Sequence, residues 1–139
     1  MTRTTYVLDA CALLAVLGSE QGADKVVEIY QKAASGEVAL IMNKLNLLEV
    51  FYNLYRAYGK KQADKFLDEV GRSPIAVNAE ITDEIFAEAG RLKASHKISL
   101  ADAIALAEAS VSGGVLLTAD HHEFDVIEKN EDISFVWIR

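Results

Sequence analysis

Short apolar runs alternate with helix-like segments along the whole chain, and this alternation limits the fold more than any other feature. The runs lie at 4–8, 37–42, 75–77, 115–118 and 133–138. Several are apolar on both faces, as strands are when helices cover both sides of a parallel sheet. Strands joined by helices pair in parallel through right-handed crossovers. We therefore predict one α/β domain over residues 1–139, with three layers in which helices flank both faces of a parallel sheet.

Helical spacing and capping signals place the expected helices between these strands. One helix is expected to start after Asn43 or Asn46, to run to about residue 58 and to stop at Gly59. Only a short helical turn is expected after Asp120. The remaining helices are expected at 10–17, 21–35, 61–70, 82–96 and 100–112.

The composition indicates a soluble cytoplasmic protein. The lone Cys11 cannot form an intramolecular disulfide, which suits a reducing compartment. Asp9 interrupts the first apolar run, so the chain has no recognisable secretory signal. The apolar run at 100–111 carries Asp102 and Glu108 and is too short to span a membrane. We expect a cytoplasmic protein with no membrane contact.

The net charge of −7 argues against a generic nucleic-acid-binding module, because such binding depends on clustered Lys and Arg. It argues less against a nuclease, since carboxylates that hold divalent cations stay negative until the cations bind. An acidic chain also suits a basic protein partner.

Four acids fall where α/β sheets build their sites. Asp9 and Asp120 come just after predicted strands, and Glu49 and Asp102 lie in the first turns of predicted helices. The carboxyl ends of parallel strands share one edge of the sheet, so the four acids can converge there. Carboxylates brought together repel each other unless cations lie between them. Mg²⁺ or Mn²⁺, which prefer oxygen ligands, are the natural occupants.

Helix capping is the alternative explanation for each acid taken alone. A carboxylate at a helix start accepts backbone N–H bonds and suits the helix dipole. The spacings from Ser99 to Asp102 and from Asn46 to Glu49 also resemble capping boxes. Capping explains Asp102 least well, because its helix is apolar nearly all round and a buried acid needs a partner or a metal.

The helix that carries Glu49 has a polar face made by Glu49, Asn53, Arg56 and Lys60. This face could hold a metal at the Glu49 end and a phosphate at the other end, near Arg56 and Lys60. A solvated face with ordinary ion pairs is an equally good interpretation. The opposite, aromatic side is expected to be core, with contact to a partner as the lesser alternative, and consists of Leu47, Leu48, Phe51, Leu54, Tyr55 and Tyr58.

Four stretches carry the acids in the order Asp, Glu, Asp, Asp. At this chain length they resemble the PIN-domain family, in particular the VapC-like toxins of bacterial and archaeal toxin–antitoxin pairs. After the first Asp the family often has a hydroxyl or amide residue, whereas Ala10 and Cys11 offer neither. The stretches are Tyr6-Val-Leu-Asp9, Asn46-Leu-Leu-Glu49, Ile98-Ser-Leu-Ala-Asp102 and Leu117-Thr-Ala-Asp120.

The resemblance implies an endoribonuclease that depends on Mg²⁺ or Mn²⁺, with Asp9, Glu49, Asp102 and Asp120 as catalytic metal ligands. It makes Thr118 a supporting polar residue. It also implies a homodimer and a small antitoxin partner, for which the acidic site suggests a basic inhibitory segment. Two alternatives remain: a PIN-like module that acts through protein contacts alone, and a nuclease of RNA processing or DNA repair with no toxin role.

Overall fold

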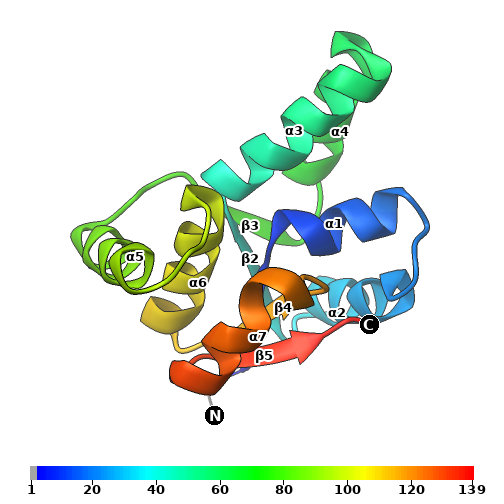
Figure 1. Cartoon of the computed structure of the whole chain (residues 1–139). Coiled ribbons are helices and arrows are strands. Elements are labelled where there is room, and N and C mark those ends of the chain that lie inside the picture. The colour runs from blue at the N-terminus through cyan, green and yellow to red at the C-terminus, as the bar shows by residue number, and fades with distance from the viewer. Residues whose placement is uncertain (1–2) are drawn as a thin grey trace.

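The computed structural model describes residues 3–139 and contains a five-stranded sheet in the order β3-β2-β1-β4-β5. All four strand pairs are parallel, which confirms the predicted α/β fold (Figure 1). The chain leaves the central strand β1 toward β2 and β3, and later returns to the other side of it through β4 and β5. The order therefore reverses between β1 and β4, where open α/β sheets place their sites. The strands are β1 (Thr5–Leu8), β2 (Ala39–Asn43), β3 (Ile75–Asn78), β4 (Val115–Thr118) and β5 (Ser134–Trp137).

Helices cover both faces of the sheet, as predicted. One buried cluster joins the sheet to α1, α2, α3 and α4 through side chains such as Val26, Val50 and Phe66. The second cluster joins it to α5, α6 and α7 and includes Leu92 and Phe124. No helix among residues 3–139 has the length and apolar character that crossing a membrane requires. The helices are α1 (Ala10–Leu17), α2 (Ala23–Ala34), α3 (Lys44–Tyr58), α4 (Lys60–Gly71), α5 (Asp83–Ser95), α6 (Leu100–Ser112) and α7 (His121–Asn130).

The prediction that Asn43 caps α3 is confirmed, whereas the Asn46–Glu49 capping box and the short turn after Asp120 are wrong. The N-cap of α3 is Asn43, whose side chain accepts from the Leu45 N–H over 2.9 Å. Asn46 therefore lies inside α3 and forms no capping box with Glu49. The turn expected after Asp120 is the ten-residue helix α7, because Phe124 and Ile127 recur at helical spacing and are both buried.

Helices α3 and α4 form a hairpin that projects from the rest of the molecule (Figure 1). Gly59 joins them at φ +89°, a left-handed conformation that favours glycine. The predicted burial of the aromatic side of α3 is wrong at Leu48, Tyr55 and Tyr58, which are 50%, 46% and 70% exposed. Only the first turns of α3, with Leu47 and Val50, contribute buried side chains to the core.

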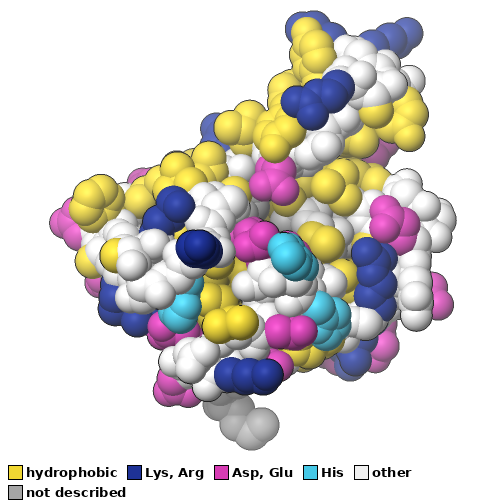
Figure 2. Space-filling view, viewed as in Figure 1, with side chains coloured by type: hydrophobic (Ala, Val, Ile, Leu, Met, Phe, Trp, Pro, Cys, Tyr) yellow, Lys and Arg dark blue, Asp and Glu magenta, His cyan; other side chains and the backbone are white. Residues whose placement is uncertain are grey.

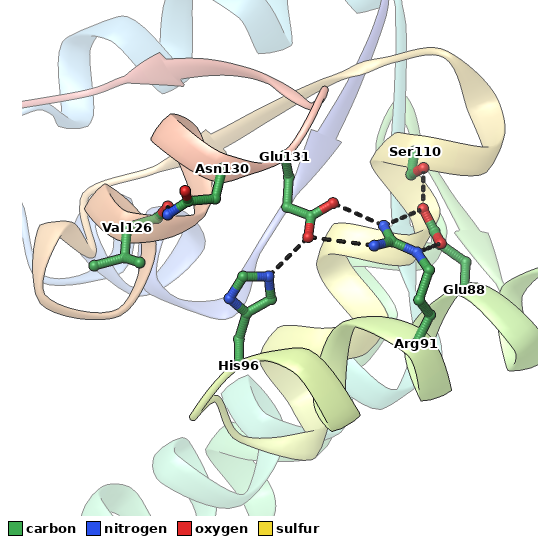
Figure 3. Close-up of polar contacts among 7 residues, drawn as sticks. All are labelled: Glu88, Arg91, His96, Ser110, Val126, Asn130 and Glu131. Carbon is green, nitrogen blue, oxygen red and sulfur yellow. Dashed lines mark hydrogen bonds and ion pairs between the residues drawn. The ribbon is translucent and has the colours of Figure 1, made fainter.

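A network of ion pairs holds the end of α7 against α5 and α6 (Figure 3). The Arg91 guanidinium donates to both Glu88 and Glu131, at 2.7 Å and 2.8 Å. His96 Nε2 lies 2.7 Å from Glu131, and the Ser110 hydroxyl donates to Glu88. The hydrogen bonds with Arg91 and His96 hold the pKa of Glu131 below its usual range. The network thereby fixes the far end of the helix that begins at Asp120.

Candidate active site

The structure brings the four predicted acids to one edge of the sheet. Asp9 follows β1 and caps α1, and Asp120 lies two residues after β4 and caps α7. Strands β1 and β4 are neighbours in register, so these two acids emerge side by side. Glu49 lies in the second turn of α3, and Asp102 lies in the first turn of α6. In the view of Figure 2, acidic side chains lie at the middle of the molecular surface, beneath the projecting hairpin of α3 and α4.

Asp9 is the most buried member, with 4% of its surface exposed. Burial raises its pKa to about 7, and the charges of Asp102 and Asp120 add to the rise. Its hydrogen bonds to the Thr118 hydroxyl and the Ala12 N–H, the latter over 2.8 Å, act in the opposite direction. A buried carboxylate with no cation beside it is costly, which marks this position as a functional candidate.

Thr118 is fully buried and connects two of the acids. Its hydroxyl oxygen accepts from the Asp120 N–H over 3.0 Å and also hydrogen-bonds the Asp9 side chain. Polar support for Asp9 thus comes from the end of β4. It replaces the hydroxyl or amide that Ala10 and Cys11 do not supply.

Asp102 and Glu49 belong to the same electrostatic environment. Burial raises the pKa of Asp102 to about 6, against a hydrogen bond from Ser99, and the charges of Asp120, Glu123 and Glu49 raise it further. Burial also raises the pKa of Glu49, together with the charge of Asp120. Since the charge of Asp120 raises the pKa of Asp9, of Glu49 and of Asp102, the four acids form one cluster.

Glu123 is an acid near the cluster that the sequence analysis missed. It lies in the first turn of α7, and its N–H donates to Asp120 over 3.1 Å. Its negative charge is among those that raise the pKa of Asp102. Its position three residues after Asp120 could have indicated this, because residues three apart in a helix lie next to each other on its surface.

These acids cap helices and also lie together in one cluster, so both interpretations of their positions apply. Asp9 and Asp120 accept from backbone N–H groups of α1 and α7, and the Ser99 hydroxyl accepts from the Asp102 N–H over 3.1 Å. Capping accounts for each acid separately. It does not account for the convergence of carboxylates from four helices at one sheet edge, which costs electrostatic energy.

The donor set fits a hard divalent cation such as Mg²⁺ or Mn²⁺, because all of its side-chain donors are carboxylate oxygens. Within residues 3–139, no three His, Cys, Asp or Glu side chains lie close enough to hold one ion between them. Mg²⁺ does not require that arrangement, since it keeps several waters and binds through one or two carboxylates plus substrate phosphate. The residues therefore fit an ion that is held partly through water.

The polar face predicted on α3 is shorter than expected. Arg56 lies over the Tyr52 ring, 5.4 Å from its centre, and is exposed on the same helix as Glu49. Lys60 belongs to α4 and pairs with Asp64 at 2.5 Å. Gly59 breaks the helix between them, so Lys60 does not continue the face on which Glu49 and Arg56 lie.

In the absence of metal, the protein should be more stable at pH 5 than at pH 8. The pKa of Asp9 lies above its unfolded value near 3.8, so the folded state takes up a proton that the unfolded state does not. Stability is therefore gained as pH falls through 7, by roughly 3 kcal/mol from Asp9 down to pH 5. Urea unfolding in EDTA measures this, and Asp9→Asn should flatten the profile. An equally steep profile in that variant would refute the assignment.

The sheet order and the acidic edge together define a class: a three-layer α/β protein with a carboxylate cluster at the point where the strand order reverses. The chain belongs to the PIN domain family, whose model matches residues 6–130. No curated protein sequence matches the chain.

Solved structures with the same fold include several toxin–antitoxin complexes. VapBC-1 from nontypeable Haemophilus influenzae has a TM-score of 0.75 at 16% identity, over 97% of this chain and 98% of that chain. DNA-bound VapBC from Salmonella typhimurium has a TM-score of 0.73 at 12% identity, over 98% and 99%. VapC20 from Mycobacterium tuberculosis, a Sarcin-Ricin loop cleaving toxin, has a TM-score of 0.56 at 18% identity, over 80% and 86%. At these identities the similarity shows the fold.

Proposed function

We propose that this chain is a metal-dependent endoribonuclease and the toxin of a type II toxin–antitoxin pair. The observation that carries the proposal is the convergence of Asp9, Glu49, Asp102 and Asp120 in a PIN domain, with burial and mutual repulsion raising the pKa of three of them. An RNA-cleaving toxin and toxin–antitoxin complexes among the similar structures support the choice of substrate and partner.

The four acids would hold Mg²⁺ or Mn²⁺, which supplies an activated water and stabilises charge on the phosphate. Asp9 is oriented for this role by the Ala12 N–H and the Thr118 hydroxyl, and Asp120 by its own N–H bond to that hydroxyl. Arg56 is exposed on α3, two turns beyond Glu49, and would contact a flanking RNA phosphate. The carboxylate cluster and the Arg56 guanidinium would then both contact the bound RNA.

Incubation of the purified protein with single-stranded and structured RNAs tests this activity. Internal cleavage is expected with Mg²⁺ or Mn²⁺, and none with EDTA. Cleavage that is equal in EDTA would remove the metal from the proposal. Absence of cleavage in every RNA and metal would favour a PIN-like module that acts through protein contacts.

An apolar groove gives the proposed antitoxin a docking surface. Leu17, Val27 and Tyr30 line it between α1, α2 and α4, each about 40% exposed. Adjoining hollows share Leu17 and continue toward α3. Glu20 and Glu69 line parts of these hollows, and the chain carries a net charge of −7. A partner segment with apolar and basic residues would suit this groove, because its Arg or Lys side chains would neutralise Glu20 and Glu69.

Where a small open reading frame lies beside this gene, co-expression of the two should yield a co-purifying complex that protects RNA from cleavage. Val27→Asp should weaken the complex at least about tenfold by burying a charge in the groove, while cleavage by the free protein persists. Val126→Asp, at a 57% exposed position on α7, is the matched control. A partner that binds without protecting RNA would remove the toxin role and leave the ribonuclease proposal intact.

Exposed apolar side chains outside this groove support the proposed homodimer. Leu48 on α3, Phe86 on α5 and Leu100 on α6 are each at least half exposed. Burial of these side chains against a second copy would be favourable. Light scattering on the purified chain should give twice the monomer mass of 15.2 kDa, and Phe86→Glu should reduce it.

A further inference from the structure

A buried polar cluster lies outside the acidic site and consists of Glu108, Asn43 and Asn78. Glu108 occupies the middle of α6 and is 4% exposed. One of its carboxylate oxygens accepts from the Asn43 amide over 2.8 Å and from the Asn78 amide over 2.5 Å. The two asparagines end β2 and β3 and are paired in register. The cluster therefore joins α6 to the carboxyl ends of two strands.

Asn43 also connects this cluster to α3. Its side-chain oxygen accepts from the Leu45 N–H and caps the helix, while its amide donates to Glu108. Glu49 lies six residues beyond Asn43 on α3, and Asp102 lies six residues before Glu108 on α6. Six residues of helix span about 9 Å. A shift at the buried cluster would therefore move both acids relative to each other.

A second contact joins the same two helices nearer the site. The Asn46 amide donates to the Ala101 carbonyl over 2.9 Å, one residue before Asp102. Asn46 is 2% exposed, and among the described residues its side-chain oxygen is the one buried side-chain atom with no hydrogen-bond partner. This single hydrogen bond near the acids still allows α3 and α6 to rotate relative to each other about it. The Glu108 cluster is the second point that fixes α3 against α6.

We propose that Glu108 is a positioning residue that sets the separation of Glu49 and Asp102 and thereby the affinity of the site for a divalent ion. This inference rests on the proposed metal-dependent function. Glu108 acts through hydrogen bonds to Asn43 and Asn78, since the structure gives it no cationic partner among residues 3–139.

Substitutions at Glu108 separate hydrogen bonding from charge. Glu108→Gln keeps an oxygen that can accept from both amides, and Glu108→Asp withdraws it by one methylene. Glu108→Ala removes the acceptor altogether. Ile29→Ala in α2 truncates a buried side chain in the other layer and serves as a destabilised control.

Calorimetric titration with Mn²⁺ at 20 °C, on variants shown to be folded by circular dichroism, tests the proposal. Glu108→Asp and Glu108→Ala should raise the Mn²⁺ Kd by about tenfold or more, the range seen when supporting contacts of metal ligands are removed. Glu108→Gln and Ile29→Ala should stay within about twofold of wild type. If Glu108→Ala does not fold, Glu108→Asp and Glu108→Gln carry the test.

Wild-type affinity in Glu108→Asp, or equal loss in Glu108→Gln or Ile29→Ala, would overturn the positioning role. Absence of Mn²⁺ binding in wild type would instead overturn the metal-dependent function. A metal-free crystal structure separates the two cases, because the distance between the Cα atoms of Glu49 and Asp102 should change in Glu108→Asp. An unchanged distance would overturn the inference by itself.

Discussion

Asp120→Asn should lower the rate of RNA cleavage by at least about a thousandfold while the protein remains folded. Asp120 is one of the negative charges that raise the pKa of Asp9, Glu49 and Asp102, so it lies at the centre of the cluster. The amide can still cap α7 but cannot supply a negative ligand oxygen. Loss of one charge should also raise the melting temperature without metal, because repulsion in the cluster falls.

An exposed acid at another helix start provides the control for this substitution. Asp24 lies in the first turn of α2, and Asp24→Asn should cleave RNA at the wild-type rate. Initial rates with a fluorescent RNA and circular dichroism spectra give the two readouts. Full Mg²⁺-dependent activity in Asp120→Asn would refute the assignment of this site.

Mn²⁺ should stabilise the wild-type protein, and Asp102→Ala should abolish that response. At a concentration about 100 times its Kd, an ion that binds only the folded state adds about 2.7 kcal/mol of stability. For a domain of this size, the melting temperature should rise by roughly 8 °C. Asp102 is central because its carboxylate senses Asp120, Glu123 and Glu49 from two other helices.

Differential scanning fluorimetry with and without Mn²⁺ measures the shift. Asp83→Ala removes an exposed acid from the first turn of α5 and should keep the full response. A shift in Asp102→Ala as large as in wild type would place the bound ion elsewhere on the protein. Loss of the shift in Asp83→Ala as well would show that the response is not specific to the cluster.

The acids at the strand ends could be found without a structure because their position follows from local pattern. Apolar runs too short for helices predicted the strands, and helical spacing between them predicted a parallel sheet. In a parallel sheet the carboxyl ends of neighbouring strands share one edge. The positions of Asp9 and Asp120 in the chain were therefore enough to place them at that edge.

Other features depend on which surfaces meet, and local sequence does not determine this. The sequence pattern assigned the aromatic side of α3 to the core, but α3 extends beyond the sheet and leaves Tyr55 and Tyr58 exposed.

Glu108 is a single acid in an apolar helix, and its partners Asn43 and Asn78 lie 65 and 30 residues away. The sequence determined the fold class and the edge that carries the acids, because both follow from spacing along the chain. Tertiary structure decided how that edge is held, because hydrogen bonds between distant residues form only after the layers have packed.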